Sequence, residues 1–258
     1  MSSNTNGRET MLRIAGVRKS YGQKVALKNL DLELYAGEVF AFLGHNGAGK
    51  TTTLKLTVGL LQPDAGSISV CGYSMRNDAI AGKSHVAYVP DQPHLYDKLT
   101  GREFLEFTLE MYRIPATVGR SRLAMWSERL EMNSFLDQLN ETYSHGMKQR
   151  VALAAALIHE PDLLVVDEPL VGLDPRTIRV ARNIFREFAD SGRTVFMSTH
   201  TLDIAEQVAD RIGIIQEGVL TALGTLTELR DAAAHNGRLE DVFMRLTGGA
   251  ISPEAEVA

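Results

Sequence analysis

Apolar positions along the chain fall into short runs typical of strands in a sheet that is covered on both faces. The segment 30–34 alternates leucine with acidic residues, which is the period-two pattern of a half-buried strand. After a turn at 36–37, five apolar residues at 39–43 predict a strand that is buried on both faces. Similar apolar runs follow at 86–89, 163–166 and 195–197. Because helical stretches separate these runs, the pattern predicts alternating β and α elements around a mostly parallel sheet.

One region interrupts this alternation, because from Thr100 to about Leu139 the sequence has a helical pattern throughout. Thr100 and Glu103 have the spacing of a capping box, which predicts that a helix begins there. The side of this helix that we expect to face the core carries Phe104, Leu105, Phe107 and Leu109. The pattern therefore predicts a helical subdomain inserted into the sheet domain.

Composition narrows the class of protein. The 258 residues are 44% hydrophobic and 23% charged, which is ordinary for a folded domain with a sizeable core. The net charge of −5 argues against a general nucleic-acid binder, and the single cysteine, Cys71, fits a reducing cytoplasm. The longest apolar run, 151–158, is far shorter than the roughly 20 residues that a bilayer helix needs, and segment 1–10 is polar and unlike a secretory signal. We therefore expect any work at a membrane to depend on another chain.

A glycine-rich segment after the apolar run 39–43 carries the strongest chemical signal. It matches the phosphate-loop pattern G-x-x-x-x-G-K-[ST], with a buried strand before it and a helix predicted over 51–60 after it. The segment consists of Gly44, His45, Asn46, Gly47, Ala48, Gly49, Lys50, Thr51 and Thr52. Glycines allow successive backbone N–H groups to point inward at a helix N-terminus, which forms an anion site. Lys50 would then bridge the β- and γ-phosphates of a nucleotide, and the Thr51 hydroxyl would bind Mg²⁺.

Two carboxylates end the apolar run 163–166. Alone, Asp167 and Glu168 are as expected of a solvated strand end, but a phosphate loop in the same parallel sheet changes this interpretation. Ligands of such sheets lie at the carboxyl ends of the strands. Asp167 would therefore lie near Mg²⁺, and Glu168 would orient or deprotonate the attacking water.

Together these motifs resemble those of the ATP-binding subunits of ABC transporters, over roughly residues 11–224. Leu173-Asp174 resembles the family's D-loop, and Ser198-Thr199-His200 resembles the segment whose histidine contacts the γ-phosphate. Tyr21 lies where the family carries an aromatic residue that stacks on adenine, although a tyrosine at a strand edge is an equally good description of it.

The resemblance also implies an architecture for the whole chain. The fold class is α/β, a P-loop ATPase with a mostly parallel core sheet, an antiparallel β subdomain and a helical subdomain at about 97–150. A flexible segment 1–10 would precede the ATPase domain at 11–224, and a helical extension and tail would follow at 225–258.

The sequence YSHGM occupies the place of the family's signature, LSGGQ. The resemblance implies that Ser144, His145, Gly146 and Met147 contact the γ-phosphate of an ATP held by a second ATPase subunit, expected to be an identical copy. Asp174 would join the same nucleotide site. His145 replaces a signature glycine, which affects how closely the backbone approaches the phosphate, although a protonated imidazole could add a positive donor.

A second departure lies after the apolar run 86–89. The family's Q-loop glutamine, a metal contact, would fall on Asp91, and Gln92 follows immediately. Either Asp91 takes the metal role or Gln92 reaches it through a shift of one residue. We favour Gln92, together with Thr51 and Asp167, as the metal-binding set.

The implied function is ATP-driven transport through separate integral membrane permease subunits, with ATP and Mg²⁺ as ligands and a location at the inner face of the cell membrane. The segment 239–248 resembles the end of ATPases that pair with ABC-2-type permeases, which favours export. The alternative is a soluble ABC ATPase that acts on nucleic acid or ribosomes. The net negative charge and the absence of a heptad run argue against that class, so no nucleic-acid partner is expected.

Overall fold

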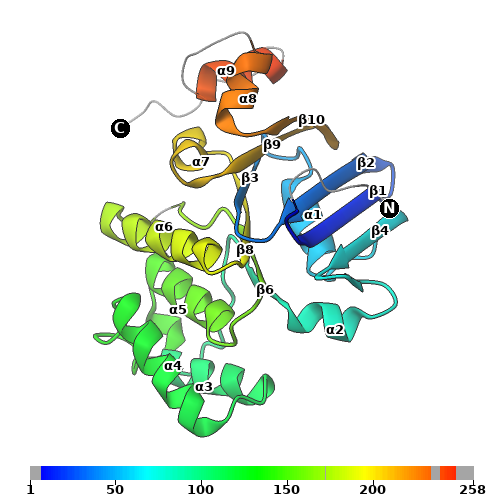
Figure 1. The fold of residues 1–258 in the computed structure, drawn as a ribbon. Helices are drawn as coiled ribbons and strands as arrows, with labels where there is room; N and C mark the ends of the chain where they lie inside the picture. Colours follow the sequence, from blue (N-terminus) through cyan, green and yellow to red (C-terminus); the bar gives the residue numbers. More distant parts are fainter. Residues whose placement is uncertain (1–6, 172, 234–238, 248–258) are drawn as a thin grey trace.

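The computed structural model describes residues 7–171, 173–233 and 239–247, arranged as two sheets with helices around them (Figure 1). The strands are β1 (Thr10–Tyr21), β2 (Lys24–Tyr35), β3 (Val39–Leu43), β4 (Ala65–Val70), β5 (Tyr73–Ser74), β6 (Val86–Val89), β7 (Leu163–Asp167), β8 (Thr194–Thr199), β9 (Arg211–Gln216) and β10 (Val219–Gly224). The helices are α1 (Lys50–Thr57), α2 (Ala79–Ser84), α3 (Gly101–Met111), α4 (Ala116–Arg129), α5 (His145–Leu157), α6 (Pro175–Asp190), α7 (Leu202–Val208), α8 (Leu226–Ala232) and α9 (Leu239–Thr247), with a short 3-10 helix, η1 (Asn140–Thr142).

The larger sheet is the predicted mostly parallel one. Its strand order is β10-β9-β3-β8-β7-β6, and every neighbouring pair is parallel except β9 with β10. The four apolar runs identified in the sequence form β3, β6, β7 and β8. Since the carboxyl ends of these strands lie along one edge of the sheet, that edge brings together segments far apart in the sequence.

The smaller sheet is antiparallel, with the order β2-β1-β4-β5. The predicted antiparallel β subdomain is therefore present, and the leucines at 30–34 belong to its strand β2. Helix α1 lies between the two sheets (Figure 1). This position presents the N-terminus of α1 to the edge where the core strands end.

Strand β3 divides the core into two apolar clusters, because all five of its residues are buried and successive side chains point to opposite faces. Val39, Ala41 and Leu43 pack into the cluster that includes α5 and α6. Phe40 and Phe42 pack toward α1 and the antiparallel sheet, and each ring lies 5.7 Å from that of Phe196, centroid to centroid. The two clusters fix β3, and with it the start of the glycine-rich loop.

The helical insert begins at the capping box that the sequence predicts. The Thr100 side chain accepts from the Glu103 N–H, and the Glu103 carboxylate accepts from the Thr100 N–H. The expectation of helix up to Leu139 is wrong, because α4 ends at Arg129 and turns occupy 130–139. Phe107 is also wrongly assigned to the core: its side chain is 40% exposed, whereas Leu105 and Leu109 one turn apart are buried.

The end of one helix differs from the sequence pattern. Helix α1 ends at Thr57 rather than at Leu60, because Gly59 adopts the left-handed conformation that commonly terminates a helix.

The expected flexible start and the end of the expected tail, residues 1–6 and 248–258, lie outside the described residues. Helices α8 and α9 occupy the described part of the expected extension. None of the helices in the described ranges combines the length and the apolar character needed to cross a bilayer.

Candidate functional site

The loop between β3 and α1 depends on its glycines. At Gly44 there is no room for a side chain, since a Cβ atom would lie 2.5 Å from the carbonyl oxygen of Ile215. Gly49 has a φ of 114°, and a Cβ atom there would lie 2.8 Å from the carbonyl oxygen of Ala26. Gly47, with a φ of 81°, also lies in the left-handed region. The loop therefore curls at the N-terminus of α1, where the first helical N–H groups have no partner within the helix.

Lys50 is the basic group at the centre of this loop. Its side chain is only 6% exposed, and Nζ donates to the carbonyl oxygen of Gly44 at 2.6 Å. Burial lowers the pKa of the ammonium group, and the charges of Glu168 and Asp167 oppose this shift. Glu168 Oε1 lies 3.6 Å from Nζ. A buried ammonium group beside a concave set of N–H groups fits a phosphate, because phosphate supplies the negative charge that stabilises both.

The two predicted carboxylates follow one another at the end of β7 but have different environments. Asp167 is 2% exposed and accepts a short hydrogen bond from the Ser198 hydroxyl on the neighbouring strand β8. Glu168 has a left-handed backbone, with a φ of 48°, and its N–H donates to the carbonyl oxygen of Ser198 at 3.1 Å. The sharp change of direction sends the Glu168 side chain toward Lys50.

His200 contacts Glu168 through two atoms. Its Nδ1 lies 3.0 Å from Glu168 Oε1, and its backbone N–H donates to Oε2 at 3.2 Å. Glu168 Oε1 thus lies between Lys50 and His200. Lys50, Glu168 and His200, each predicted from a separate segment of the sequence, therefore meet at the carboxyl edge of the core sheet.

A pocket of about 380 Å³ opens beside this cluster. The predicted site residues that line it are Tyr21, His45, Asn46, Gly47, Gly49, Lys50, Thr51, Thr52, Asp167 and Glu168. Ala48 is 5% exposed and packs into the apolar cluster behind the loop. The pocket joins the glycine-rich loop to the aromatic ring at the end of β1.

The wall of this pocket includes Asp91 and not Gln92. The Asp91 carbonyl oxygen accepts a hydrogen bond from the Gln149 side chain at 3.1 Å, which ties the segment after β6 to α5. Gln92 is exposed. Both candidate metal contacts, Gln92 and Asp91, stay predictions, and the lining of the pocket favours Asp91.

The donor set at the pocket fits Mg²⁺. Magnesium prefers hard oxygen ligands, and it usually bridges one or two protein oxygens and the oxygens of a phosphate. The Thr51 hydroxyl and the Asp167 carboxylate are the groups that would hold it here, and both line the pocket. When bound, the ion would neutralise negative charge on the phosphates.

The YSHGM segment forms the N-terminus of α5. Ser144 is the N-cap residue, and its hydroxyl accepts from the Met147 N–H at 3.3 Å. Ser144 and His145 are exposed, while Gly146 and Met147 are half-buried. None of these four residues is among those that line the pocket beside Lys50. Within one chain, the described structure therefore holds this helix end apart from the glycine-rich loop.

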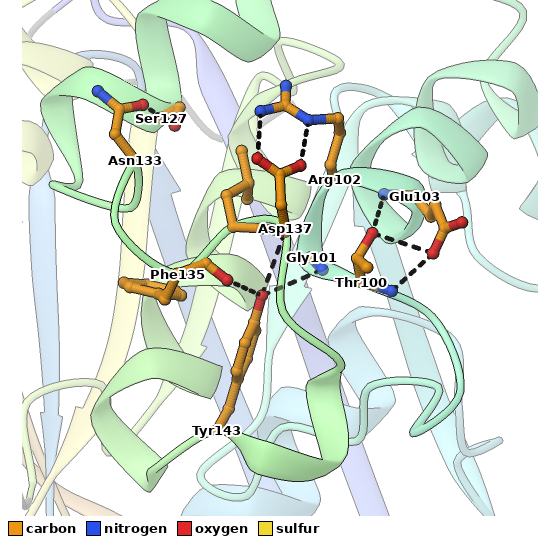
Figure 2. Close-up of polar contacts among 10 residues, drawn as sticks. Thr100, Gly101, Arg102, Glu103, Ser127, Asn133, Phe135, Asp137 and Tyr143 are labelled. Atoms are coloured by element: carbon orange, nitrogen blue, oxygen red, sulfur yellow. Dashed lines mark hydrogen bonds and ion pairs between the residues drawn. The ribbon is translucent and has the colours of Figure 1, made fainter.

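Tyr143 anchors the start of this segment in the helical insert (Figure 2). Its hydroxyl accepts from the Gly101 N–H at 3.1 Å and donates to the carbonyl oxygen of Phe135 at 2.9 Å. The Tyr143 side chain is buried, and its ring meets that of Phe135 edge-on. The position of Ser144 is therefore coupled to the start of α3 and to the turns after α4.

Asp174 is the N-cap of α6. Its carboxylate accepts from the N–H groups of Arg176 and Thr177, both at 3.0 Å, and from the Thr177 hydroxyl at 2.6 Å. These hydrogen bonds, with that from the Thr177 side chain the strongest, lower the pKa of Asp174. A Cβ atom on Gly146 would lie 3.5 Å from the Leu173 side chain, so the predicted D-loop is adjacent to the YSHGM helix end.

Three residues at the site were missed by the sequence reasoning. Ser198 donates to Asp167, and Tyr88 forms a side-chain hydrogen bond with the same carboxylate. Burial, with Asp167 adding to it, raises the pKa of Tyr88. Lys24 lines the pocket because a tight turn pairs it with Tyr21 across the first hairpin. Only Ser198 had a usable signal, namely its place at the end of an apolar run beside that of Asp167.

Comparison with known proteins identifies relatives of the chain. The profile of the ABC transporter family matches residues 27–171. The chain is 37% identical over 219 residues to the linearmycin resistance ATP-binding protein LnrL of Bacillus subtilis (strain 168). That alignment covers 85% of this chain and 70% of LnrL. The chain is 38% identical over 208 residues to the Nod factor export ATP-binding protein I of Burkholderia orbicola (strain AU 1054), covering 81% and 68%. A solved structure described as the ATP binding subunit of an ABC transporter superimposes with a TM-score of 0.88 at 31% identity, over 92% of this chain and 100% of that one.

Proposed function

We propose that this chain, which belongs to the ABC transporter family and is one of its ATP-binding, ATP-hydrolysing subunits, powers export through a separate membrane permease. One observation carries the proposal: Lys50 and Glu168 line a pocket whose floor is a phosphate-type loop, and His200 contacts Glu168. Two relatives support export, since one is named for linearmycin resistance and the other for Nod factor export.

In this proposal the glycine-rich loop and Lys50 bind the phosphates of ATP, and Tyr21 stacks on the adenine. The Thr51 hydroxyl and the Asp167 carboxylate hold Mg²⁺, with Asp91 on the same wall of the pocket. Ser198 donates to Asp167 and so orients that carboxylate.

Glu168 is the residue that we assign to the attacking water. Its side chain is 13% exposed and is held from one side by Lys50 and from the other by His200. As the water oxygen bonds to the γ-phosphorus and the bond to the β-phosphate oxygen breaks, a proton passes from the water toward Glu168. His200 orients this carboxylate and, from its place beside the pocket, would donate to the γ-phosphate.

The nucleotide site would be completed by a second copy of the chain. Ser144 and His145 are exposed at a helix N-terminus, which favours an anion through its free N–H groups and its partial positive charge. Since these residues do not line their own chain's pocket, they would contact an ATP held by the partner copy. Loss of the γ-phosphate would then release the two copies from one another.

The permease would dock on the groove between the core sheet and the helical insert. A pocket of about 410 Å³ lies there, and Leu95, Phe104 and Tyr112 contribute to its largely apolar lining. Tyr96 and Met111 lie close by in the sequence and are also exposed, at 59% and 66%. An apolar helical segment of a membrane protein fits such a surface, and it would hold the chain at the inner face of the membrane.

The test of this proposal is Glu168→Gln. The amide cannot accept the proton of the water, so we expect ATP hydrolysis to fall by roughly 10²- to 10⁴-fold while ATP binding is retained. With Mg·ATP the variant should elute as a dimer in size-exclusion chromatography. Glu160→Gln, at an exposed carboxylate remote from the pocket, is the matched control and should behave as the parent protein.

Two outcomes would contradict the proposal. Hydrolysis by Glu168→Gln at the parental rate would show that Glu168 does not act in the reaction. If Glu168→Gln binds ATP with parental affinity but stays monomeric when every site is loaded, the nucleotide site is not shared between two copies.

A further inference from the structure

Three side chains of kinds that can bind a metal meet at the edge of the core sheet opposite the nucleotide pocket. Cys71 lies in the turn between β4 and β5, His85 immediately precedes β6, and Asp162 immediately precedes β7. One ligand atom from each residue lies within 4.8 Å of the other two. The amino ends of parallel strands lie at the edge away from their carboxyl ends, so this cluster is separate from Asp167 and Glu168.

The backbone holds the three side chains in these positions. The carbonyl oxygen of His85 accepts from the N–H groups of Asp162 and Leu163, at 2.9 and 3.0 Å, which fixes the starts of β6 and β7 against one another. The Cys71 N–H donates to the carbonyl oxygen of Met11 at 2.8 Å, which attaches the turn to β1. The three ligand atoms therefore meet through the fold and not through flexible side chains alone.

The His85 imidazole is oriented by two contacts. Its Nδ1 lies 2.6 Å from Asp162 Oδ2, and the Tyr73 ring stacks on the imidazole with centroids 5.1 Å apart and an interplanar angle of 13°. These two contacts hold the imidazole in place beside the Asp162 carboxylate. The imidazole is 33% exposed and the Asp162 side chain 44%, so an ion can reach them from solvent.

The local charge favours a cation. The carboxylates of Asp162 and Glu9 both act electrostatically on the Cys71 side chain. A divalent cation would reverse the unfavourable interaction between these carboxylates and a thiolate. An apolar packing role for Cys71, which contacts the cluster around α1, would not require His85 and Asp162 beside it.

We propose that Cys71, His85 and Asp162 bind a divalent cation of the zinc class. A thiolate, an imidazole and a carboxylate together suit a borderline-soft ion with four ligands, and water would supply the fourth position. Binding displaces the thiol proton to the buffer as the sulfur–metal bond forms. Mg²⁺ is excluded by its preference for oxygen ligands. The ion would connect the β4–β5 turn of the antiparallel sheet to β6 and β7 of the core sheet.

The experiment titrates the untagged, nucleotide-free full chain with Zn²⁺ by calorimetry. We expect one site per chain, with a heat that changes with the ionisation enthalpy of the buffer because a proton is released. Cys71→Ser, His85→Gln and Asp162→Asn should each weaken binding by at least about tenfold. His94→Gln, at an exposed histidine in the docking groove with no thiol beside it, is the matched control and should leave the affinity unchanged.

A second measurement keeps the test independent of stability. Co²⁺ added to the folded parent protein should produce a thiolate charge-transfer band in the near ultraviolet, which Cys71→Ser should lack and His94→Gln should keep. Circular dichroism of each variant without metal establishes that it is folded. Zinc binding of parental affinity in Cys71→Ser, or no binding to the parent protein, would overturn the proposal.

Discussion

Glu168 shows how one side chain can hold two others in place before a ligand arrives. Its Oε1 atom is 3.6 Å from Lys50 Nζ and 3.0 Å from His200 Nδ1. Lys50 is buried and needs a counter-charge, which Glu168 provides here together with the Gly44 carbonyl oxygen. A phosphate would take over the contact with Lys50 and leave Glu168 to act on water. The ion pair of Lys50 and Glu168 thus stabilises the site without nucleotide, and Glu168 is the base that acts when nucleotide is bound.

His159 leads to a prediction about pH. Its ring stacks on Tyr112 at a centroid distance of 3.7 Å, and burial, with a smaller effect of Arg122, lowers its pKa to about 4. The unfolded chain binds this proton near pH 6.5. His159 therefore does not affect the free energy of unfolding above about pH 6.5. As the pH drops from there toward 4, protonation of His159 in the unfolded chain lowers the free energy of unfolding by up to about 1.4 kcal/mol per pH unit.

The variant His159→Phe isolates this effect, because it keeps a stacked ring but cannot take up a proton. We expect its stability to decline less steeply between about pH 6.5 and 4 than that of the parent protein. Urea unfolding of both proteins at several pH values measures the difference, and the carboxylates common to both cancel. Parallel curves would show that His159 is protonated in the folded protein.

The turns after α4 and the start of α3 are joined through Tyr143, which directly precedes the α5 N-cap Ser144 (Figure 2). The shared element is the Tyr143 hydroxyl, which joins the Gly101 N–H to the Phe135 carbonyl group. The Arg102 guanidinium and the Asp137 carboxylate form a second, exposed link between the same segments. An exposed pair of this kind contributes little, so the buried hydroxyl is the stronger constraint.

Tyr143→Phe should therefore weaken catalysis without affecting the glycine-rich loop. The change leaves the buried Gly101 N–H without its partner, at a cost of about 1–3 kcal/mol, and loosens the attachment of Ser144. We expect a lower ATPase rate and unchanged nucleotide affinity of the monomer. Thr100→Ala, which removes the neighbouring capping box at a cost of about 1 kcal/mol, is the control for a general loss of stability. An equal loss of activity in both variants would contradict a specific role for Tyr143.

Local signals made several of these elements predictable. The capping box at Thr100 and Glu103 was predicted correctly because both partners lie within one helical turn. The core face of α3 was predicted except for one residue. Leu105 and Leu109 are buried and Phe104 packs against the same core cluster, whereas Phe107 is exposed. Apolarity in a sequence does not distinguish a side chain that packs in the core from one that lies on an apolar surface.

Alternating apolar runs predicted a parallel sheet but could not give its strand order. Strand β3 pairs with β8 and β9, which follow it by more than a hundred residues, and no local pattern encodes that pairing. The same limit explains why Tyr88 was missed and Asp91 was left open as site residues. Tyr88 meets Asp167 because β6 pairs with β7, and Asp91 is held by a hydrogen bond from Gln149 on α5.

The pocket beside Lys50 and the α5 N-terminus are separate features of one chain, and a shared nucleotide site requires that they meet across two copies. Complementation tests this arrangement. Lys50→Ala removes the phosphate contact in its own copy. Gly146→Asp places a carboxylate where the partner's γ-phosphate would lie, and it is tolerated by the fold because the new Cβ atom makes only an ordinary contact, 3.5 Å from Leu173. Each variant alone should lose most of its ATPase activity.

Mixing the two variants should restore activity if the site is shared. In a dimer of one Lys50→Ala copy and one Gly146→Asp copy, both defects fall on the same nucleotide site and the other site is intact. Random pairing makes half of the dimers mixed, so an equimolar mixture should recover about one quarter of the parental sites. The steady-state ATPase rate of the mixture, compared with each variant at the same total concentration, measures this recovery. If the α5 N-terminus acted on its own chain's nucleotide, every copy in the mixture would carry a defective site and the rate would not exceed the average of the two variants.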